Sequence, residues 1–299
     1  MGDTFLKYLD EFKHFLRFEK RYSSHTLLAY TTDLEQFSKY LSKNYEETIS
    51  LPELSHFHLR SWLAELKEAG QKERSINRKI SSISGYYKYM LRKGLVQSNP
   101  CSLVHALRLP ERLPTFLKES ETELLLDTLS FGTDFNACTE KLILELLYSC
   151  GMRRSELIHL KESDIEWSLF QIRVLGKGNK ERLIPASNVL LDQIRDYISA
   201  KAAENIESSH LLCLSNGKAL YDKYVYACVK KYLAQVTSLK KKSPHILRHT
   251  FATHLLNNGA SIQAIKELLG HASIAATQVY THINIDELKK VHKLNHPRG

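Results

Sequence analysis

Residues 165–185 read IEWSLFQIRVLGKGNKERLIP, and this stretch decides the fold class. Phe170, Ile172 and Val174 alternate with polar residues, which is typical of a half-buried strand. The run Gly176–Asn179 is rich in turn-forming residues, so Arg182–Pro185 can pair back onto the strand before it. The stretch therefore predicts a small antiparallel hairpin or a three-stranded sheet.

On both sides of this sheet, apolar residues recur at helical spacing. The clearest case places Ile76, Ile80, Ile83, Tyr87 and Met90 on one face of a single helix. The predicted helices cover 4–19, a segment that starts at about Ser24, 59–69, 73–93, 119–129, 139–149, 155–160, 187–203, 221–236 and 245–295. The fold class is therefore mainly α with a small antiparallel β-sheet.

Prolines divide the chain. The 299 residues are enough for two domains with separate cores, and Asn99-Pro100, Pro110 and Pro114 mark a region where long helices are disfavoured. We predict a helical N-terminal domain over 1–106, an extended linker over 107–114 and a second domain over 115–299.

The charge of the chain favours a polyanionic partner. The net charge is +9, and the basic residues gather in 67–93, where only Glu68 and Glu73 oppose them. They are predicted to lie on helix faces away from the apolar residues and to contact DNA phosphates, which fixes position and not sequence. The predicted DNA contacts are Lys72, Arg74, Arg78, Lys79 and Lys88.

Cysteine and apolar patterns predict a soluble cytoplasmic protein with no membrane partner. The five cysteines are scattered and form no C-x-x-C pair, which favours reduced thiols. Charged residues near the N-terminus exclude the apolar core of a signal peptide. The longest apolar stretch, Leu142–Cys150, is interrupted by Glu145 and is too short to cross a bilayer.

The C-terminal third carries residues suited to phosphate chemistry. Ser243 can cap a helix that begins at Pro244, and His245 and Arg248 then share one face of its first turn. A helix start with free N–H groups and cationic side chains suits a phosphate. His271 and Tyr280 follow. Together these residues are suited to an attack by the Tyr280 phenol on a phosphodiester.

A zinc site is a weaker interpretation of the same stretch. His245 and His249 stand four residues apart, but Ile246 follows the first histidine where a metalloprotease motif has glutamate. A third ligand is not evident from the sequence. No metal is therefore predicted. A phosphate-binding loop of the G-x-x-x-x-G-K-[ST] type is also absent from the sequence, so no nucleotide cofactor is predicted either.

Five motifs occur in an order and at spacings that resemble the tyrosine site-specific recombinases of the phage-integrase family. They are Tyr148–Leu157 (YSCGMRRSEL), Gly176–Arg182 (GKGNKER), His245-x-x-Arg248, Leu269-Gly270-His271 and Tyr280. The run from Ser243 to Arg298 is most similar to the Xer branch (XerC/XerD-like), and the helical first unit resembles the family's SAM-like core-binding domain.

The resemblance implies a two-domain DNA clamp that cleaves and rejoins DNA. Tyr280 would be the nucleophile, and a 3′-phosphotyrosyl link would conserve the bond energy without ATP, metal or another cofactor. Always-protonated arginines suit the phosphate oxygens, and Glu156 would orient one of them without touching substrate. Lys177 would protonate the leaving 5′-oxygen, His245 would assist proton transfer and His271 would donate to the phosphate. The implied catalytic set is Arg153, Lys177, His245, Arg248, His271 and Tyr280.

The resemblance also implies an assembly. Four protomers would act on two DNA sites through a Holliday junction, with this chain or a related recombinase as partner and a septal DNA translocase in control. The biological outcome would be resolution of chromosome dimers at cell division. The apolar stripe Leu288, Val291 and Leu294 either docks on its own domain or, as the resemblance implies, packs on a neighbouring protomer.

Several alternatives stay open at this stage. A mobile-element integrase or invertase would use the same chemistry at other sites, a catalytically idle protein of this fold would only bind DNA, and a type IB topoisomerase would not need a second site. Arg154 beside Arg153 and Lys180 beside Lys177 are rivals within their motifs. For each pair, the motif position favours the first-named candidate for catalysis.

Overall fold

A computed structural model describes residues 5–45, 49–109, 115–176, 181–270 and 285–299. The chain divides into two compact units, Met1–Arg112 and Leu113–Gly299, and each has its own apolar core. This division falls within the predicted linker 107–114, of which 110–114 lie outside the described residues. The domain boundaries at 106 and 115 stay predictions.

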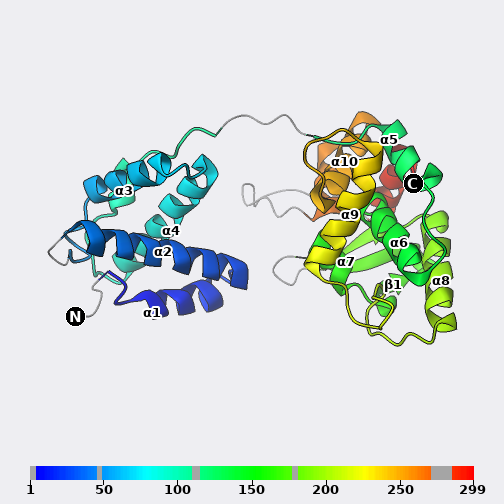
Figure 1. Ribbon diagram of the computed structural model, residues 1–299, viewed down its shortest axis with the longest axis horizontal. Helices are drawn as coiled ribbons and strands as arrows, with labels where there is room; N and C mark the ends of the chain where they lie inside the picture. Colours follow the sequence, from blue (N-terminus) through cyan, green and yellow to red (C-terminus); the bar gives the residue numbers. More distant parts are fainter. Residues whose placement is uncertain (1–4, 46–48, 110–114, 177–180, 271–284) are drawn as a thin grey trace. The chain divides into compact units, whose positions relative to one another are not determined.

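The described part of the N-terminal unit is helical. In Figure 1, the long helix α2 lies between α1 and α4, and it packs against both. A five-residue π-helical turn follows α1, so the predicted helix over 4–19 is shorter and less regular than its apolar spacing indicates. The elements are α1 (Leu9–His14), the π-helix Phe15–Glu19, α2 (Ser24–Asn44), α3 (His56–Glu68), α4 (Glu73–Arg92) and the 3-10 helix Pro100–Leu103.

Helix α4 supplies the largest share of this core. The predicted apolar stripe from Ile76 to Met90 is confirmed, because all five of its members are buried. Tyr86 and Tyr87 are also buried, and each hydroxyl donates to a backbone carbonyl: to Phe5 O at 2.8 Å and to Leu51 O at 3.0 Å. Burying a phenol without such a partner would cost free energy, so these bonds allow tyrosine in the core.

Lys79 corrects one prediction about the basic residues of α4. Its side chain is buried, and Nζ donates to Asp33 Oδ1 of α2 at 2.9 Å and also to Gln36. Asp33 is completely buried and accepts from Ser82 Oγ at 2.8 Å. A buried carboxylate needs a paired cation, so Lys79 faces the core, and the prediction that it lies on the solvent side and contacts DNA is wrong.

The other predicted DNA contacts of the N-terminal unit face solvent. Lys72, Arg74 and Lys88 are exposed. Arg78 is exposed over 42% of its side chain, although it also donates to Asp33 and to Ala29 O. Phosphate contact by these four residues stays a prediction.

The C-terminal unit places a small antiparallel sheet beside a helical core. The strand order is β1-β2-β3, and Ile172 of β2 pairs with Ile184 of β3, so the predicted three-stranded sheet is confirmed. Phe170 is not part of strand β2, contrary to the prediction from its alternation with Ile172 and Val174. It is exposed, has φ of 50°, and ends a 3-10 turn before β2. The strands are β1 (Ile165–Glu166), β2 (Gln171–Leu175) and β3 (Glu181–Pro185).

Helix α6 lies at the centre of this unit. Figure 1 shows it with α8 on one side and α9 and α10 on the other, and it packs against all three. Its residues Leu142–Leu147 are buried all round, which explains why its apolar pattern is nearly continuous. The helices are α5 (Glu119–Glu123), followed by the π-helix Leu124–Thr128, α6 (Phe135–Ser149), α7 (Arg154–His159), α8 (Asn188–Ala203), α9 (Asp222–Val236), α10 (Pro244–Asn257), α11 (Ile262–Leu269) and α12 (Ile285–Asn295).

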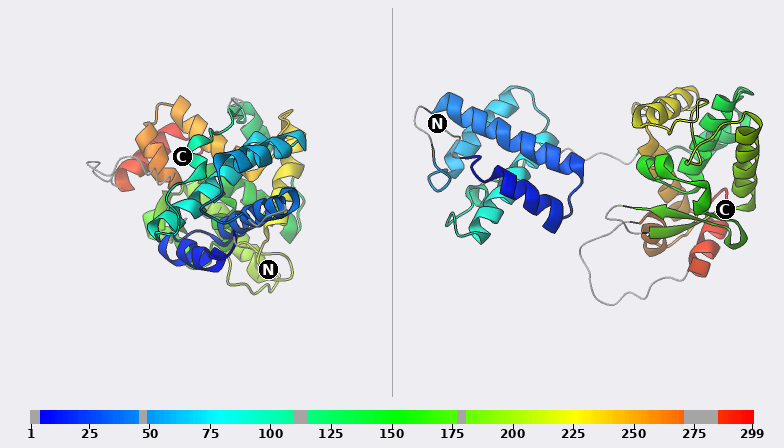
Figure 2. Two further views of the ribbon diagram at one scale, coloured as in Figure 1. Left: turned by 90° about the vertical axis from the view of Figure 1, so that its left-hand side faces the viewer. Right: turned by 90° about the horizontal axis from the view of Figure 1, so that it is seen from below.

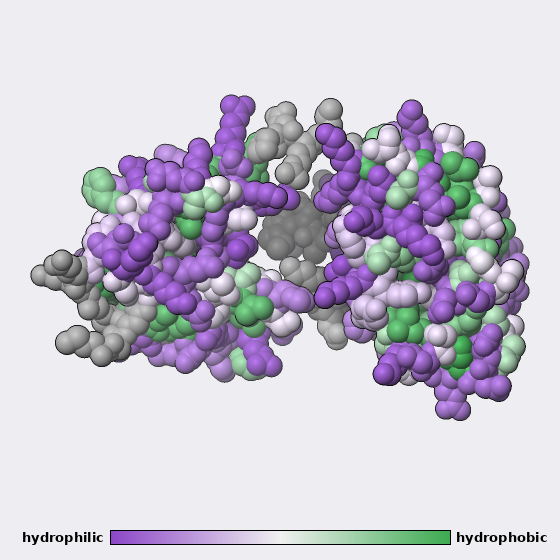
Figure 3. Space-filling model, viewed as in Figure 1, coloured by the Kyte–Doolittle hydropathy of each residue, from purple (hydrophilic) through white to green (hydrophobic). Residues whose placement is uncertain are grey.

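The surface of each unit is mainly polar on the face shown in Figure 3, with apolar residues in small scattered groups. Within the ranges that the structure describes, no helix has both the length and the apolar composition that a membrane span requires.

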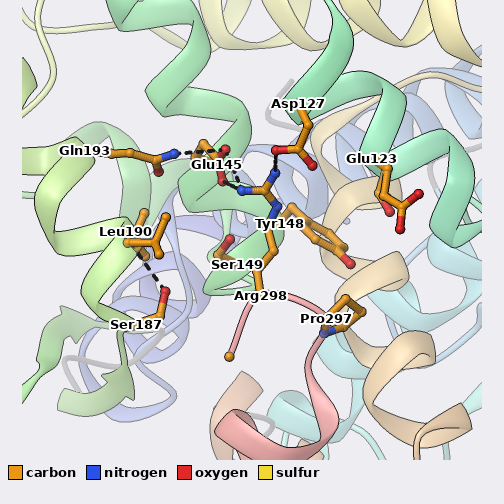
Figure 4. A pocket seen from close by; sticks show the side chains of 13 residues that line it. Glu123, Asp127, Glu145, Tyr148, Ser149, Ser187, Leu190, Gln193, Pro297 and Arg298 are labelled. Atoms are coloured by element: carbon orange, nitrogen blue, oxygen red, sulfur yellow. Dashed lines mark hydrogen bonds and ion pairs between the residues drawn. The ribbon is translucent and has the colours of Figure 1, made fainter.

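The terminal helix α12 packs on its own unit, at the edge visible in the right-hand view of Figure 2. Leu288 joins the cluster around Phe251, and buried His292 donates from Nε2 to Ser149 O at 2.9 Å. Figure 4 shows Arg298 reaching Glu145 and Asp127; its Nη1 lies 3.1 Å from Glu145 Oε1. In the single chain, therefore, the tail docks in cis; packing on a neighbouring protomer stays a prediction.

The docked tail should make stability depend on pH. Burial lowers the pKa of His292, and burial together with the charges of neighbouring histidines and Arg298 lowers the pKa of His296 well below 6.5. As pH falls below about 6.5, the unfolded chain binds protons that the folded chain does not, so the free energy of unfolding falls by up to about 1.4 kcal/mol per histidine per pH unit. We expect a lower Tm at about pH 5.5 than at about pH 7.5, and lower hydrogen-exchange protection factors in α12, each taken relative to the intrinsic exchange rate at the same pH.

A matched pair of variants checks this prediction. His296→Gln removes a buried histidine and should flatten the pH dependence, whereas His159→Gln removes an exposed one and should leave it unchanged. A Tm that is the same at both pH values would contradict the expectation.

Candidate active site

The turn between α6 and α7 presents Arg153. Gly151 adopts φ of +56°, and a Cβ there would lie 2.5 Å from the ring of Phe251, so only glycine fits this turn. Arg153 is the N-cap residue in front of α7, and Glu156, one turn later, accepts its backbone N–H at 2.7 Å through Oε2. The other oxygen, Oε1, accepts from Arg153 Nη1, also at 2.7 Å. A carboxylate in the first turn thus caps the helix and orients the arginine in front of it.

Helix α10 presents His245 and Arg248. It begins at Pro244 with Ser243 at the N-cap position, as predicted, but the Ser243 hydroxyl makes no capping bond and is buried without a partner among the described residues. Arg248 is only 7% exposed. Its Nη1 donates to Gly151 O and its Nη2 to Leu269 O, both at 2.6 Å.

Arg182 of β3 is the site residue that the sequence analysis missed. Its Nη1 and Nη2 donate to both oxygens of Glu156 at 2.7 and 2.8 Å, and its Nε donates to Leu268 O at 3.0 Å. A signal for it was present. Arg182 and the buried Ile184 are two residues apart in a strand, so their side chains lie on the same face. A cation on an inward face needs a buried anion, and Glu156 supplies it.

The end of α11 is where the three arginines meet. Three consecutive carbonyls each accept one of them: Leu268 O from Arg182, Leu269 O from Arg248, and Gly270 O from Arg153 Nη2 at 3.1 Å. The last carbonyls of a helix lack internal partners and carry partial negative charge, so cations are stabilised there. Residue 271 follows directly.

Electrostatics fix the protonation states of the cluster. Burial alone would raise the pKa of Glu156, but the hydrogen bond and charge of Arg182, together with the hydrogen bonds of Arg153, lower it to about 2. Burial and the charges of Arg153 and Arg182 lower the pKa of Arg248 to about 10, so it stays protonated at neutral pH. Partial burial and the charges of Lys241 and Arg248 lower the pKa of His245, which favours a neutral imidazole.

The structure brings together Arg153, Glu156 and Arg248, with His245 one turn before Arg248 on α10. The predicted residues Lys177, His271 and Tyr280, and the rival Lys180, lie outside the described residues. Arg154 forms an ion pair with Asp222 Oδ1 of α9 at 2.9 Å, away from Glu156. Three guanidinium groups around one carboxylate leave an excess of positive charge, which suits an oxyanion.

Comparisons with known proteins agree with this arrangement. Residues 115–287 match the phage integrase family, and residues 9–94 match the phage integrase N-terminal SAM-like domain. The tyrosine recombinase XerC of Listeria innocua serovar 6a is 36% identical over 292 residues, which cover 96% of this chain and 97% of that protein. The tyrosine recombinase XerD of Halalkalibacterium halodurans is 36% identical over 294 residues, which cover 97% of this chain and 98% of that protein.

Two solved structures share the fold. The Tn1549 transposon integrase in complex with circular intermediate DNA has a TM-score of 0.68 at 21% identity, covering 94% of this chain and 97% of that chain. The XerH site-specific recombinase bound to difH substrate has a TM-score of 0.65 at 22% identity, covering 89% of this chain and 76% of that chain. With the family matches, these similarities show that the chain belongs to the phage integrase family and is a tyrosine recombinase, an enzyme of DNA cleavage and rejoining.

Proposed function

We propose that this chain is a Xer-type site-specific recombinase that acts on double-stranded DNA. The observation that supports it most is the convergence of Arg153 and Arg248 on the end of α11, directly before His271. A catalytically idle DNA-binding protein would not need two phosphate-binding arginines held by a buried carboxylate. Similarity to proteins named XerC and XerD along nearly the whole chain supports the Xer assignment.

The proposed reaction exchanges one phosphodiester for another. The Tyr280 oxygen attacks phosphorus and gives up its proton to a base, for which His245 is the proposed candidate; the bond from phosphorus to the 5′-oxygen breaks, and that oxygen takes a proton from Lys177. A 3′-phosphotyrosyl link and a free 5′-hydroxyl result, and the reverse steps with a 5′-hydroxyl from the second site rejoin the strands through a Holliday junction. The number of phosphoester bonds is unchanged, so the reaction needs no energy source.

The arginine cluster supports this chemistry electrostatically. Negative charge gathers on the non-bridging phosphate oxygens in the transition state, and preorganised donors at such a position each contribute about a hundred- to a thousand-fold in rate. Arg153 and Arg248 supply those donors in the proposal. His245, with its lowered pKa, can accept a proton at neutral pH and assist transfer, and His271 donates to the phosphate.

The proposed biological role is resolution of chromosome dimers at cell division. Four protomers, identical or paired with a related recombinase, would assemble on two sites in the cytoplasm under a septal DNA translocase. The N-terminal unit would contact DNA phosphates through Lys72, Arg74, Arg78 and Lys88. The mobile-element alternative shares the chemistry and differs in the DNA site, so a site at the replication terminus supports the dimer-resolution role and a site at an element's ends contradicts it.

A two-step assay tests the function. A binding site is first selected from random duplexes by the protein itself, and a nicked suicide duplex with that site is then incubated with protein in EDTA. We expect a covalent protein–DNA adduct, and strand exchange when two intact sites are supplied. Adduct without exchange, both with this protein alone and with a related recombinase added as partner, would point to a topoisomerase, and hydrolysis that requires magnesium would refute the proposed chemistry.

A further inference from the structure

Arg182 of β3 binds two other elements of the C-terminal unit, α7 and α11. It belongs to β3, its side chain is 10% exposed, and it donates to both oxygens of Glu156 in α7 and to Leu268 O in α11. We propose that Arg182 is a positioning residue of this active site. It holds Glu156 and the end of α11 so that the guanidinium groups of Arg153 and Arg248 are oriented to bind the phosphate. This inference rests on the proposed function.

The hydrogen bonds of Glu156 show how Arg182 acts on Arg153. The carboxylate accepts four bonds, two from Arg153 and two from Arg182. Because Arg182 takes the two-point bond, Arg153 keeps only Nη1 on the carboxylate and directs Nη2 to Gly270 O. Without Arg182, the fork of Arg153 would be free to close on both oxygens of Glu156, since guanidinium and carboxylate prefer a two-point bond. The arginine would then turn away from α11.

The connection to Arg248 runs through α11. Arg182 and Arg248 donate to adjacent carbonyls of the same helix end, Leu268 O and Leu269 O. Gly270, with φ of +61°, follows, and a Cβ there would lie 2.9 Å from Arg182 Cδ. The glycine therefore leaves the space through which Arg182 reaches the helix end. Loss of Arg182 would loosen the carbonyls that Arg248 and Arg153 depend on.

Charge gives Arg182 a second effect. Glu156 opposes the positive charge that Arg153 and Arg248 would offer to a phosphate, and its Oε2 lies 4.0 Å from Arg248 Nη1. Arg182 compensates that negative charge from the side of the sheet. It also keeps Glu156 ionised, because the Arg182 hydrogen bond and charge are the largest influences lowering the pKa of this buried carboxyl.

The experiment compares Arg182→Gln with Arg173→Gln in the full-length protein. Arg173 lies on the neighbouring strand β2, is 43% exposed, and pairs with Glu166 at 3.4 Å, so it controls for loss of an arginine from the sheet. Single-turnover adduct formation on the nicked duplex, DNA affinity, Tm and the pH dependence of the adduct rate are measured for both variants and for wild type.

We expect Arg182→Gln to slow adduct formation roughly a hundred-fold, as a displacement of about 1 Å at a catalytic group does, while DNA affinity changes only a few-fold. The acid limb of the pH–rate profile should move to higher pH, because Glu156 then binds a proton more readily; a merely structural defect would not move it. Arg182→Lys should recover part of the rate, since it keeps the charge but lacks the fork. Arg173→Gln should behave as wild type.

Two results would overturn the inference: a wild-type adduct rate with an unmoved acid limb in Arg182→Gln, or equal losses in Arg182→Gln and Arg173→Gln. If Arg182→Gln does not fold at the assay temperature, Arg182→Lys decides by the same readouts. Failure of the proposed function is distinguishable, because in that case wild-type protein itself forms no adduct.

Discussion

Tyr280→Phe is expected to abolish the covalent protein–DNA adduct while leaving DNA binding intact. Phenylalanine keeps the ring and removes the single oxygen that would bond to phosphorus, so the covalent link cannot form at this position. Removing a covalent nucleophile lowers rates on the order of a million-fold, which places the adduct at background. The measurement is denaturing electrophoresis of labelled suicide duplex after incubation in EDTA, with a mobility shift to confirm binding.

Tyr226→Phe is the matched control for this experiment. Tyr226 is 42% exposed on α9 of the same unit, so its loss should change neither adduct formation nor stability. Burial raises the pKa of Tyr148 and Tyr197, which makes these phenols poorer candidates for attack. An adduct that persists in Tyr280→Phe, or that maps to another tyrosine, would refute the assignment of the nucleophile.

Arg248→Gln is expected to have the second-largest effect, because Arg248 bonds two backbone carbonyls and is also the proposed donor to the phosphate. Loss of a preorganised charge donor should slow adduct formation about a thousand-fold. The change also removes the donors of two buried carbonyls, Gly151 O and Leu269 O, and each unsatisfied group costs about 1–3 kcal/mol of stability. Single-turnover cleavage and denaturant unfolding measure the two effects separately.

Two further variants separate charge from geometry at this position. Arg248→Lys keeps a cation but cannot bond both carbonyls as the fork does, so it should recover only part of the rate and of the stability. Arg195→Gln removes an arginine that is 55% exposed and paired with exposed Asp192, and should shift stability by no more than about 0.5 kcal/mol. Wild-type cleavage by Arg248→Gln would exclude Arg248 from the phosphate site.

Much of the fold could be predicted from apolar spacing. The stripe on α4 and the strands around Ile172 and Ile184 are confirmed, because their periods of 3.6 and 2 follow directly from burying one face. The π-helical turns Phe15–Glu19 and Leu124–Thr128 were not predicted, since a single five-residue turn is too short for its period to be read from apolar spacing.

The errors and omissions at charged residues share one cause. Lys79 is buried because Asp33 of α2 needs a cation, and Arg182 is held at the site because Glu156 needs one. Both partners are distant in sequence, by 46 and 26 residues, so a local pattern cannot pair them. By contrast, the orientation of Arg153 by Glu156 is a local effect within one helical turn, and the sequence analysis anticipated that contact.

The binding of three arginines to the end of α11 also determines when the protein can first cleave DNA. Arg153 directly precedes α7, whereas Arg182 and Arg248 belong to β3 and α10, and the contact that each of them makes with the end of α11 forms only after α11 has been made and folded against them. A chain still emerging from the ribosome, or one partly unfolded by heat, has the same basic residues, but its three arginines are not assembled on the end of α11. We therefore expect incomplete chains to bind DNA without cleaving it.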